Sequence, residues 1–312
     1  MESNSIKDNL SKEDMISDIL LCLGADIHRE RIYLLVEGED DIKFLRPFLS
    51  DNIYIYESYD GKNGVEYIVS ECFSTNARVI GIRDRDYQIV PISDKIFYYD
   101  YGCMEMMILK NDEVFKNLCA EYYKGNISIQ QLRIDVFREL KYLSIIRMYN
   151  ERENWGKKIR GISIDSAWNS NRKRLDNEAI LSRINQVNGG FFKDDILQKI
   201  EQEYRREWTE EDFYSNTQGH DFFMLYATIC NQYKTKGIKY TEIEASGRCI
   251  FRQNDFIQTN LYEQLSEYEN LHQFKICNGN PRGSDTVNKD TLGSGTVNEK
   301  EECMSAYTND NC

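Results

Sequence analysis

Two short segments of the sequence place carboxylates directly after apolar runs. The first is LLVEGEDD at residues 34–41, and the second is VIGIRDRD at residues 79–86. Ligands of an open parallel sheet bind beyond the carboxyl ends of its strands, so Glu37, Asp84 and Asp86 are the first candidates for chemistry. Residues two apart on an extended segment point the same way, and we therefore expect Asp84 and Asp86 to face one point.

Three carboxylates at one point repel each other unless they are protonated or share a cation. Oxygen-only donors favour Mg²⁺ or Mn²⁺ over zinc. A DxD pair alone is weak evidence, because it also occurs in glycosyltransferases and surface turns; its pairing with Glu37 carries the prediction of a metal site. Asp41 falls in a first helical turn, where it could simply cap the helix.

Basic residues accompany these acids. Lys62 follows the second expected strand on a glycine-flanked loop, where a lysine could contact a scissile phosphate or simply be solvated. Arg83 and Arg85 interleave with the acids and could neutralise the site or bind phosphate. His220, at a helix start, is interpreted as a cap or buried hydrogen-bonder rather than as a catalytic group. The three tryptophans near basic residues are interpreted as core residues rather than base-stacking platforms.

The elements around the acids follow a βαβαβ order, which is typical of a parallel sheet. We expect strands at 32–36, 53–56, 79–82 and 95–99, and helices at 40–49, 64–72, 104–109 and 112–123. After residue 124 the pattern is mostly helical, with helices expected at 128–150, 177–186, 194–208, 220–233 and 255–268. A short strand at 162–164 is expected to dock on the first domain.

The predicted organisation has four parts. A helical lead-in (1–29) precedes an α/β domain (30–123), which is followed by an α-rich domain (124–277). Residues 278–312 are polar and contain a ten-residue near-repeat, so we expect a disordered tail.

Composition narrows the class of protein. The hydrophobic content of 41% is too high for a disordered chain, and no apolar run is long enough to span a bilayer. Nine cysteines without CxxC spacing suggest free thiols and a cytoplasmic location rather than a zinc site. The net charge of -13 weighs against intrinsic nucleic-acid affinity, unless bound cations or a basic partner subunit compensate.

The acidic motifs resemble the Toprim domain of topoisomerases, primases and OLD-like nucleases. The matching residues are Glu37-Gly38 with Asp41, and Asp84-x-Asp86. The chain is more closely similar to the AriB-type Toprim effectors of PARIS anti-phage systems, through residues 99–105, 219–221 and 256–262 as well as the acidic motifs.

This resemblance implies a Mg²⁺-dependent (or Mn²⁺-dependent) nuclease that cleaves DNA or RNA, including tRNA, and that serves as a defence effector with an ABC-type ATPase partner. It implies that Glu37 is the general acid/base and that Asp84 and Asp86 are metal ligands, with Asp41 as a secondary candidate ligand. Glu105 is a candidate for a second metal site, or else an ordinary carboxylate at a helix start. Self-association into a homo-oligomer is a further expectation. The main alternative is a catalytically inactive Toprim module that assembles with the ATPase. A DxD transferase is a third hypothesis, but the sequence has no phosphate-binding loop to support it.

Overall fold

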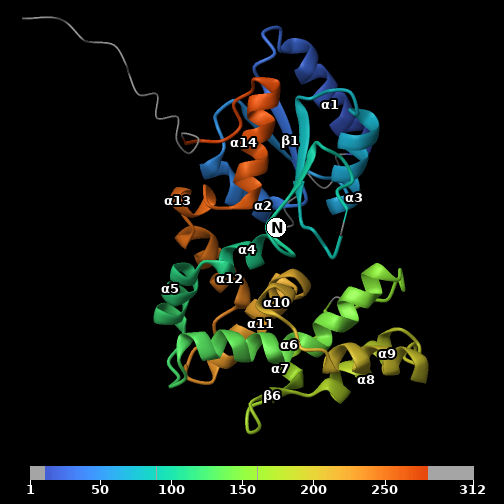
Figure 1. Cartoon of the computed structure of the whole chain (residues 1–312), viewed down its shortest axis with the longest axis vertical. Coiled ribbons are helices and arrows are strands. Elements are labelled where there is room, and N and C mark those ends of the chain that lie inside the picture. Colours follow the sequence, from blue (N-terminus) through green and yellow to red (C-terminus); the bar gives the residue numbers. More distant parts are fainter. Residues whose placement is uncertain (1–10, 89, 160, 280–312) are drawn as a thin grey trace, which may run out of the picture. The chain divides into compact units, whose positions relative to one another are not determined.

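Four parallel strands form the sheet that carries the acidic segments (Figure 1). The computed structural model describes residues 11–88, 90–159 and 161–279. The strand order is β2-β1-β3-β4, with β1 (Ile32–Val36), β2 (Ile53–Glu57), β3 (Val79–Arg83) and β4 (Ile96–Tyr98). Both central strands are buried along their whole length, as expected for a parallel sheet covered on two faces. Strand β3 pairs directly with β1, so the ends of these two strands lie side by side.

Helices cover both faces of this sheet. One face packs against α1 (Lys12–Ala25), α3 (Gly61–Glu66) and the π-helix η3 (Tyr67–Cys72). The other packs against α2 (Glu39–Leu45), the 3-10 helix η2 (Arg46–Phe48) and α14 (Asn260–His272). Gly81 of β3 permits the close approach of α3, because a Cβ at this position would lie 2.7 Å from Cγ1 of Val65.

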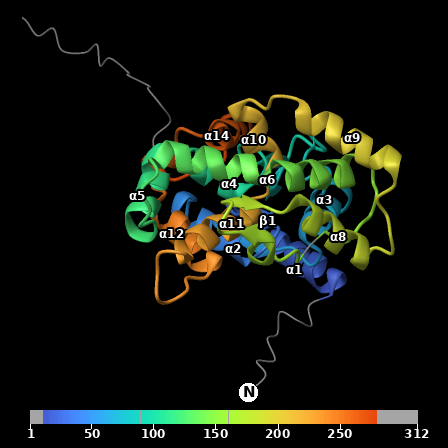
Figure 2. The ribbon, with the colours of Figure 1, turned by 90° about the horizontal axis from the view of Figure 1, so that it is seen from below.

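The remaining elements are mainly helical and share an apolar core with the second face of the sheet. Helix α6 runs past α10 and α11 (Figure 2), and a two-stranded antiparallel hairpin lies between α7 and α8. Contacts group the described residues up to Gly279 in one compact unit. The bounds are α4 (Met104–Lys110), α5 (Asp112–Tyr122), α6 (Ile129–Arg152), α7 (Ile164–Ala167), β5 (Trp168–Asn169), β6 (Arg174–Leu175), α8 (Asn177–Val187), α9 (Asp194–Arg205), α10 (Glu210–Asn216), α11 (Gly219–Asn231), α12 (Tyr240–Ile250) and α13 (Gln253–Phe256).

The structure corrects several sequence-based expectations. The strand expected at 162–164 is wrong, because Ile164 begins the short helix α7, which packs against α11. Helices α10 and α12 were not predicted, since α10 has only seven residues and α12 has few buried positions. The expected disordered tail lies, from residue 280 onward, outside the described residues.

Candidate metal centre

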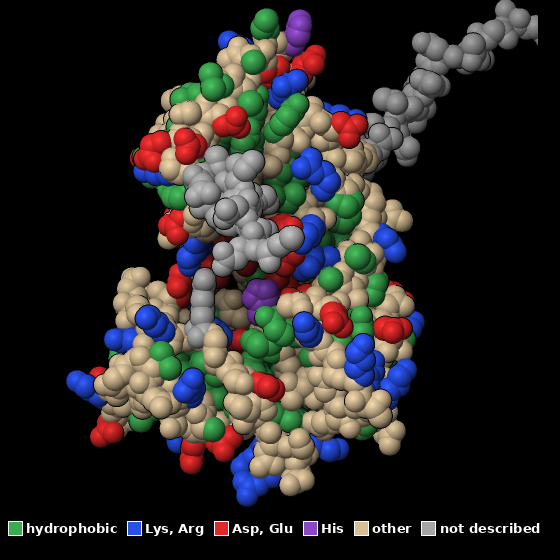
Figure 3. All heavy atoms as spheres, turned by 180° about the vertical axis from the view of Figure 1, so that it is seen from behind, with side chains coloured by type: hydrophobic (Ala, Val, Ile, Leu, Met, Phe, Trp, Pro, Cys, Tyr) green, Lys and Arg blue, Asp and Glu red, His purple; other side chains and the backbone are tan. Residues whose placement is uncertain are grey.

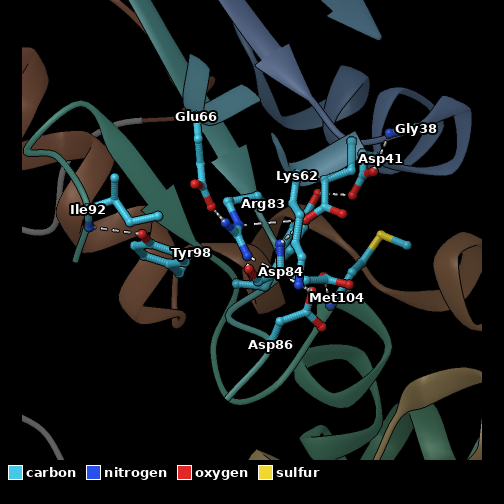
Figure 4. A network of polar contacts seen from close by, with 12 residues as sticks. Gly38, Asp41, Lys62, Glu66, Arg83, Asp84, Asp86, Ile92, Tyr98 and Met104 are labelled. Carbon is cyan, nitrogen blue, oxygen red and sulfur yellow. Dashed lines mark hydrogen bonds and ion pairs between the residues drawn. The ribbon is translucent and has the colours of Figure 1, made fainter. Parts of the chain in front are cut away.

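Glu37 and Asp84 meet at the carboxyl edge of the sheet. Glu37 directly follows β1, and Asp84 directly follows the neighbouring strand β3. The backbone N–H of Asp84 donates a hydrogen bond of 2.9 Å to Oε1 of Glu37. The backbone N–H of Met104, the first residue of α4, donates to Oδ1 of Asp84 at 3.1 Å (Figure 4). Two strand ends and the start of α4 therefore share one polar site.

The carboxyls of this site hold protons more tightly than ordinary carboxyls. Burial raises the pKa of Asp84 well above its usual value, and the negative charges of Glu105 and Glu37 add to this shift. Burial also raises the pKa of Glu37 to about 7, with a further contribution from the charge of Asp86. Because each acid resists the ionisation of the others, a cation bound among them would stabilise their charged forms.

Asp41 lies in the first turn of α2 and accepts two hydrogen bonds. The Gly38 backbone N–H donates to Oδ2 at 2.9 Å, and the Tyr99 hydroxyl donates to Oδ1 at 2.8 Å. Burial raises the pKa of Asp41 to about 6, although both hydrogen bonds act in the opposite direction. Both carboxylate oxygens of Asp41 thus accept hydrogen bonds from within the protein, while its negative charge still acts on Asp84.

Asp86 does not face the site in the way that the sequence suggested. Strand β3 ends at Arg83, and the chain then turns, with left-handed φ angles of 45° at Asp86 and 67° at Tyr87. Asp84 and Asp86 are therefore not aligned by strand alternation. Oδ2 of Asp86 lies 3.2 Å from Nζ of Lys62, and Oδ1 accepts from the side chain of Gln218 at 3.4 Å.

Arg83 is buried among acids rather than presented to solvent. Its side chain is 2% exposed and forms ion pairs with Glu66, Glu37 (Nε to Oε1, 3.8 Å) and Asp86 (Nη2 to Oδ2, 3.9 Å). Arg83 therefore neutralises the acids, which is one of the two roles expected for it. The other expected role, binding a nucleic-acid phosphate, is wrong, because the buried side chain has no open face. Arg85, by contrast, is exposed.

A second group of side chains lies at Glu105. Glu105 of α4, His220 of α11 and Glu244 of α12 each offer a ligand atom, and these atoms lie within 4.8 Å of one another. Within the described part of the chain, this is the only trio of His, Cys or carboxylate side chains that is so close. Nδ1 of His220 lies 2.7 Å from Oε1 of Glu244. This hydrogen bond raises the pKa of His220 to about 9, and the negative charge of Glu105 adds to the shift.

His220 was expected to be a cap or a buried hydrogen-bonder, and Glu244 was not among the predicted residues. The two residues lie on separate helices and form no short motif, and α12 itself was not predicted. The available signal was the Gly219-His220 pair at a helix start, because glycine permits close approach of another element. The structure shows that this element is α4, since a Cβ on Gly219 would lie 2.5 Å from Oε2 of Glu105.

A cleft of about 410 Å³ opens beside Asp86. Lys62 lies in its wall and forms an ion pair with Glu151 as well as with Asp86. Lys157 and Lys158 also line the cleft. The cleft therefore places cationic side chains next to the acidic edge of the sheet, within a chain whose net charge is negative.

The donors at the acidic edge suit a hard divalent cation. Glu37, Asp84 and Asp86 provide only oxygen atoms, which Mg²⁺ and Mn²⁺ prefer. Burial first, and then the neighbouring negative charges, raise the pKa of the Asp84 carboxyl, and a bound cation would favour its charged form. Among the described residues, the ligand atoms of Glu37, Asp84 and Asp86 do not all lie within 4.8 Å of one another. The structure therefore brings Glu37 and Asp84 together, while Asp86 pairs with Lys62 and Arg83 is a competing source of positive charge.

Comparisons with known proteins do not identify this chain. No protein-family model matches the sequence, and no curated protein matches it significantly. Among the described helices, none combines the length and apolar character needed to cross a membrane.

Proposed function

We propose that this chain is a Toprim-type nuclease that uses Mg²⁺ or Mn²⁺ to cleave phosphodiester bonds in RNA, such as tRNA, or in DNA. The observation that carries the proposal is the hydrogen bond from Asp84 N–H to Glu37 Oε1, which holds acids from two neighbouring parallel strands together. This is the edge at which open parallel sheets bind their ligands.

Glu37 is the proposed general acid/base. Its pKa of about 7 lets it accept or release a proton near neutral pH, which is where a proton-transfer group works best. Asp84 and Asp86 are the proposed metal ligands, with Asp41 and Glu105 adding negative charge around Asp84. When bound, the cation would polarise the scissile phosphate and stabilise the charge that develops on it.

The cleft beside Asp86 is the proposed path of the nucleic-acid backbone. Lys62 is already paired with Asp86, so it lies where it could contact a phosphate held at the acidic edge. Lys157 and Lys158 extend the cationic lining away from that edge. Lys157 also lies 4.6 Å from the ring centroid of Phe191, and Trp155 packs against the same ring.

The biological role is proposed from the resemblance to AriB-type effectors. In this proposal the chain is a cytoplasmic toxic effector of anti-phage defence, restrained until an ABC-type ATPase partner senses infection. The acidic net charge of -13 supports such restraint, because it weakens intrinsic affinity for nucleic acid until a partner or a second copy completes the groove.

A second candidate function, an inactive Toprim module that assembles with the ATPase, is favoured by one observation. Arg83 forms ion pairs with three carboxylates and so balances much of their charge without a metal. In that case Glu37 and its neighbours would stabilise the fold rather than perform chemistry.

The test combines a growth assay with a cleavage assay. Cells expressing the chain with the ATPase encoded beside it are challenged with phage, and total DNA and small RNA are resolved on gels. We expect growth arrest and cleavage products for the wild type and for the control variant Glu39→Gln. Glu39 is an exposed acid at the first position of α2. Glu37→Gln should abolish both, because Glu37, unlike Glu39, directly follows β1 and accepts a hydrogen bond from Asp84.

The two candidate functions predict different outcomes. Purified chain with Mn²⁺ or Mg²⁺ and the same ATPase should cut the substrate that the gels identify, and Lys62→Met should slow this cleavage by at least about 10-fold. If Glu37→Gln protects cells as well as the wild type and no nucleic acid is cleaved, the nuclease proposal is overturned in favour of the inactive Toprim module.

A further inference from the structure

Three elements that are distant in the sequence bring Glu105, His220 and Glu244 together. Glu105 is the second residue of α4, His220 is the second residue of α11, and Glu244 lies in α12. Both carboxylates are buried, with Glu105 8% and Glu244 3% exposed, whereas the His220 side chain is 60% exposed. The two carboxylates therefore form the buried side of the group, and the imidazole forms its exposed side.

The charges of this group are unbalanced. Two buried carboxylates share one imidazole, so the trio has more acidic than basic groups. Within the described residues no lysine or arginine lies within ion-pairing distance of Glu105, whose hydrogen-bonding neighbour is the thiol of Cys103. Arg248, one turn after Glu244, forms its ion pair with Asp40 at 3.0 Å, while its charge also acts on Glu244. Buried carboxylates are costly unless their charge is balanced, and a bound cation would balance the charge of this group.

A glycine allows the start of α11 to approach Glu105 of α4 closely. Gly219, directly before His220, faces Glu105, and a Cβ at Gly219 would lie 2.5 Å from the Oε2 atom of Glu105. A glycine at this position lets the start of α11 pack directly on the carboxylate. Figure 3 shows a histidine and acidic side chains together in a hollow of one face of the molecule.

We propose that Glu105, His220 and Glu244 form a second metal centre, which binds a transition-metal ion of the Zn²⁺ or Mn²⁺ class. Ligands around such an ion lie about 2.0–2.2 Å from it, and therefore about 3–3.5 Å from each other. The three ligand atoms lie within 4.8 Å of one another, so side-chain movements on the order of 1 Å would bring them into one coordination sphere. The exposed side of His220 leaves a position open for water or a substrate oxygen.

The donor set distinguishes this centre from the acidic edge of the sheet. An imidazole with two carboxylates suits Zn²⁺ or Mn²⁺, whereas the oxygen donors at Glu37 and Asp84 suit Mg²⁺. The two sets adjoin, because the charge of Glu105 also acts on Asp84. The second centre goes beyond the proposed nuclease and does not depend on it.

Zinc binding by the purified full-length chain in excess Mg²⁺ tests the proposal. Isothermal titration calorimetry with Zn²⁺ measures affinity and stoichiometry, and substitution with Co²⁺ reports the ligand type, because thiolate ligands add a charge-transfer band that imidazole and carboxylate ligands lack. All proteins carry Cys249→Ser, which removes the exposed thiol next to this site in sequence.

Matched variants separate the ligands from their surroundings. His220→Asn and Glu244→Gln remove ligands, while His28→Asn and Glu242→Gln change an exposed histidine and an exposed acid on the same helix as Glu244. Loss of a hydrogen-bonding group behind a ligand commonly costs 10–100-fold in metal affinity, so loss of a ligand should cost at least about 100-fold. The two control variants should bind Zn²⁺ like the parent protein.

A further variant, Asp84→Asn, distinguishes this proposal from the nuclease proposal. We expect Asp84→Asn to retain one Zn²⁺ per chain with a thiolate-free Co²⁺ spectrum, whether or not nucleic acid is cleaved. Equal Zn²⁺ affinity in the parent, His220→Asn and Glu244→Gln would overturn the second centre. So would a Zn²⁺ site that Asp84→Asn abolishes while both ligand variants keep it.

Discussion

Replacing Arg83 with methionine would remove a buried cation from the acidic edge of the sheet. The Arg83 side chain is 2% exposed, and its Nε donates a hydrogen bond of 2.9 Å to the carbonyl oxygen of Asp84. It also forms ion pairs with Glu66, Glu37 and Asp86. Methionine fills a similar volume, so the main loss is electrostatic.

The size of the loss follows from the exposure of the partners. Removing one member of a fully buried ion pair costs about 3–5 kcal/mol. The three carboxylates here are between 20% and 31% exposed and can recover part of their hydration. We therefore expect Arg83→Met to lower the free energy of unfolding by about 2–4 kcal/mol, which corresponds to a Tm decrease of roughly 5–15 °C for a unit of this size.

The same substitution should strengthen the binding of Mg²⁺. Without Arg83, the acids repel each other more strongly, and a divalent cation becomes their main source of positive charge. At a concentration about 100 times its Kd, Mg²⁺ would restore about 2.7 kcal/mol. Urea unfolding followed by tryptophan fluorescence, with and without Mg²⁺, measures both effects.

Arg85→Met is the matched control, because Arg85 is exposed two residues further along the chain. We expect its stability to change by less than about 0.5 kcal/mol. A loss below about 1 kcal/mol for Arg83→Met would refute the idea that Arg83 neutralises these acids. Equal stabilisation of the variant and the wild type by Mg²⁺ would refute the competition between Arg83 and a cation.

Three further predictions concern the same region. Without divalent cations, the folded-state pKa values of Glu37 (about 7) and Asp41 (about 6) lie above the ordinary values of 4.5 and 3.8. The stabilisation that these two carboxyls contribute when protonated is therefore complete below the ordinary values and is lost as the pH rises through 6 to 7. Urea unfolding between pH 4 and pH 8 should show this decline, and Glu37→Gln should flatten it. Tyr99→Phe removes the 2.8 Å hydrogen bond to Asp41, which should raise the pKa of that carboxyl further and cost about 1–2 kcal/mol, as measured by NMR titration and urea unfolding. Gly219→Ala should cost about 1–3 kcal/mol because of the close contact that its Cβ would make, while Gly237→Ala, with no atom within 4 Å of its Cβ, should change the Tm little.

The sequence alone determined the sheet and the position of its first acids. Continuous apolar runs bounded by helical segments identified β1, β2 and β3 within one residue, because buried parallel strands are apolar on both faces. The βαβαβ order predicted a parallel sheet, in which Glu37 and Asp84 both lie at the carboxyl ends of strands. That the third strand lies beside the first was decided by the tertiary structure.

Tertiary structure decided how the remaining side chains are arranged. The left-handed turn at Asp86 and the burial of Arg83 depend on neighbouring elements, and neither is visible in the pattern of residues 79–86. The trio of Glu105, His220 and Glu244 comes from three helices that are far apart in the sequence. Hydrophobic periodicity reports which face of an element is buried, but not which other element covers it, so only packing could bring these three ligand atoms together.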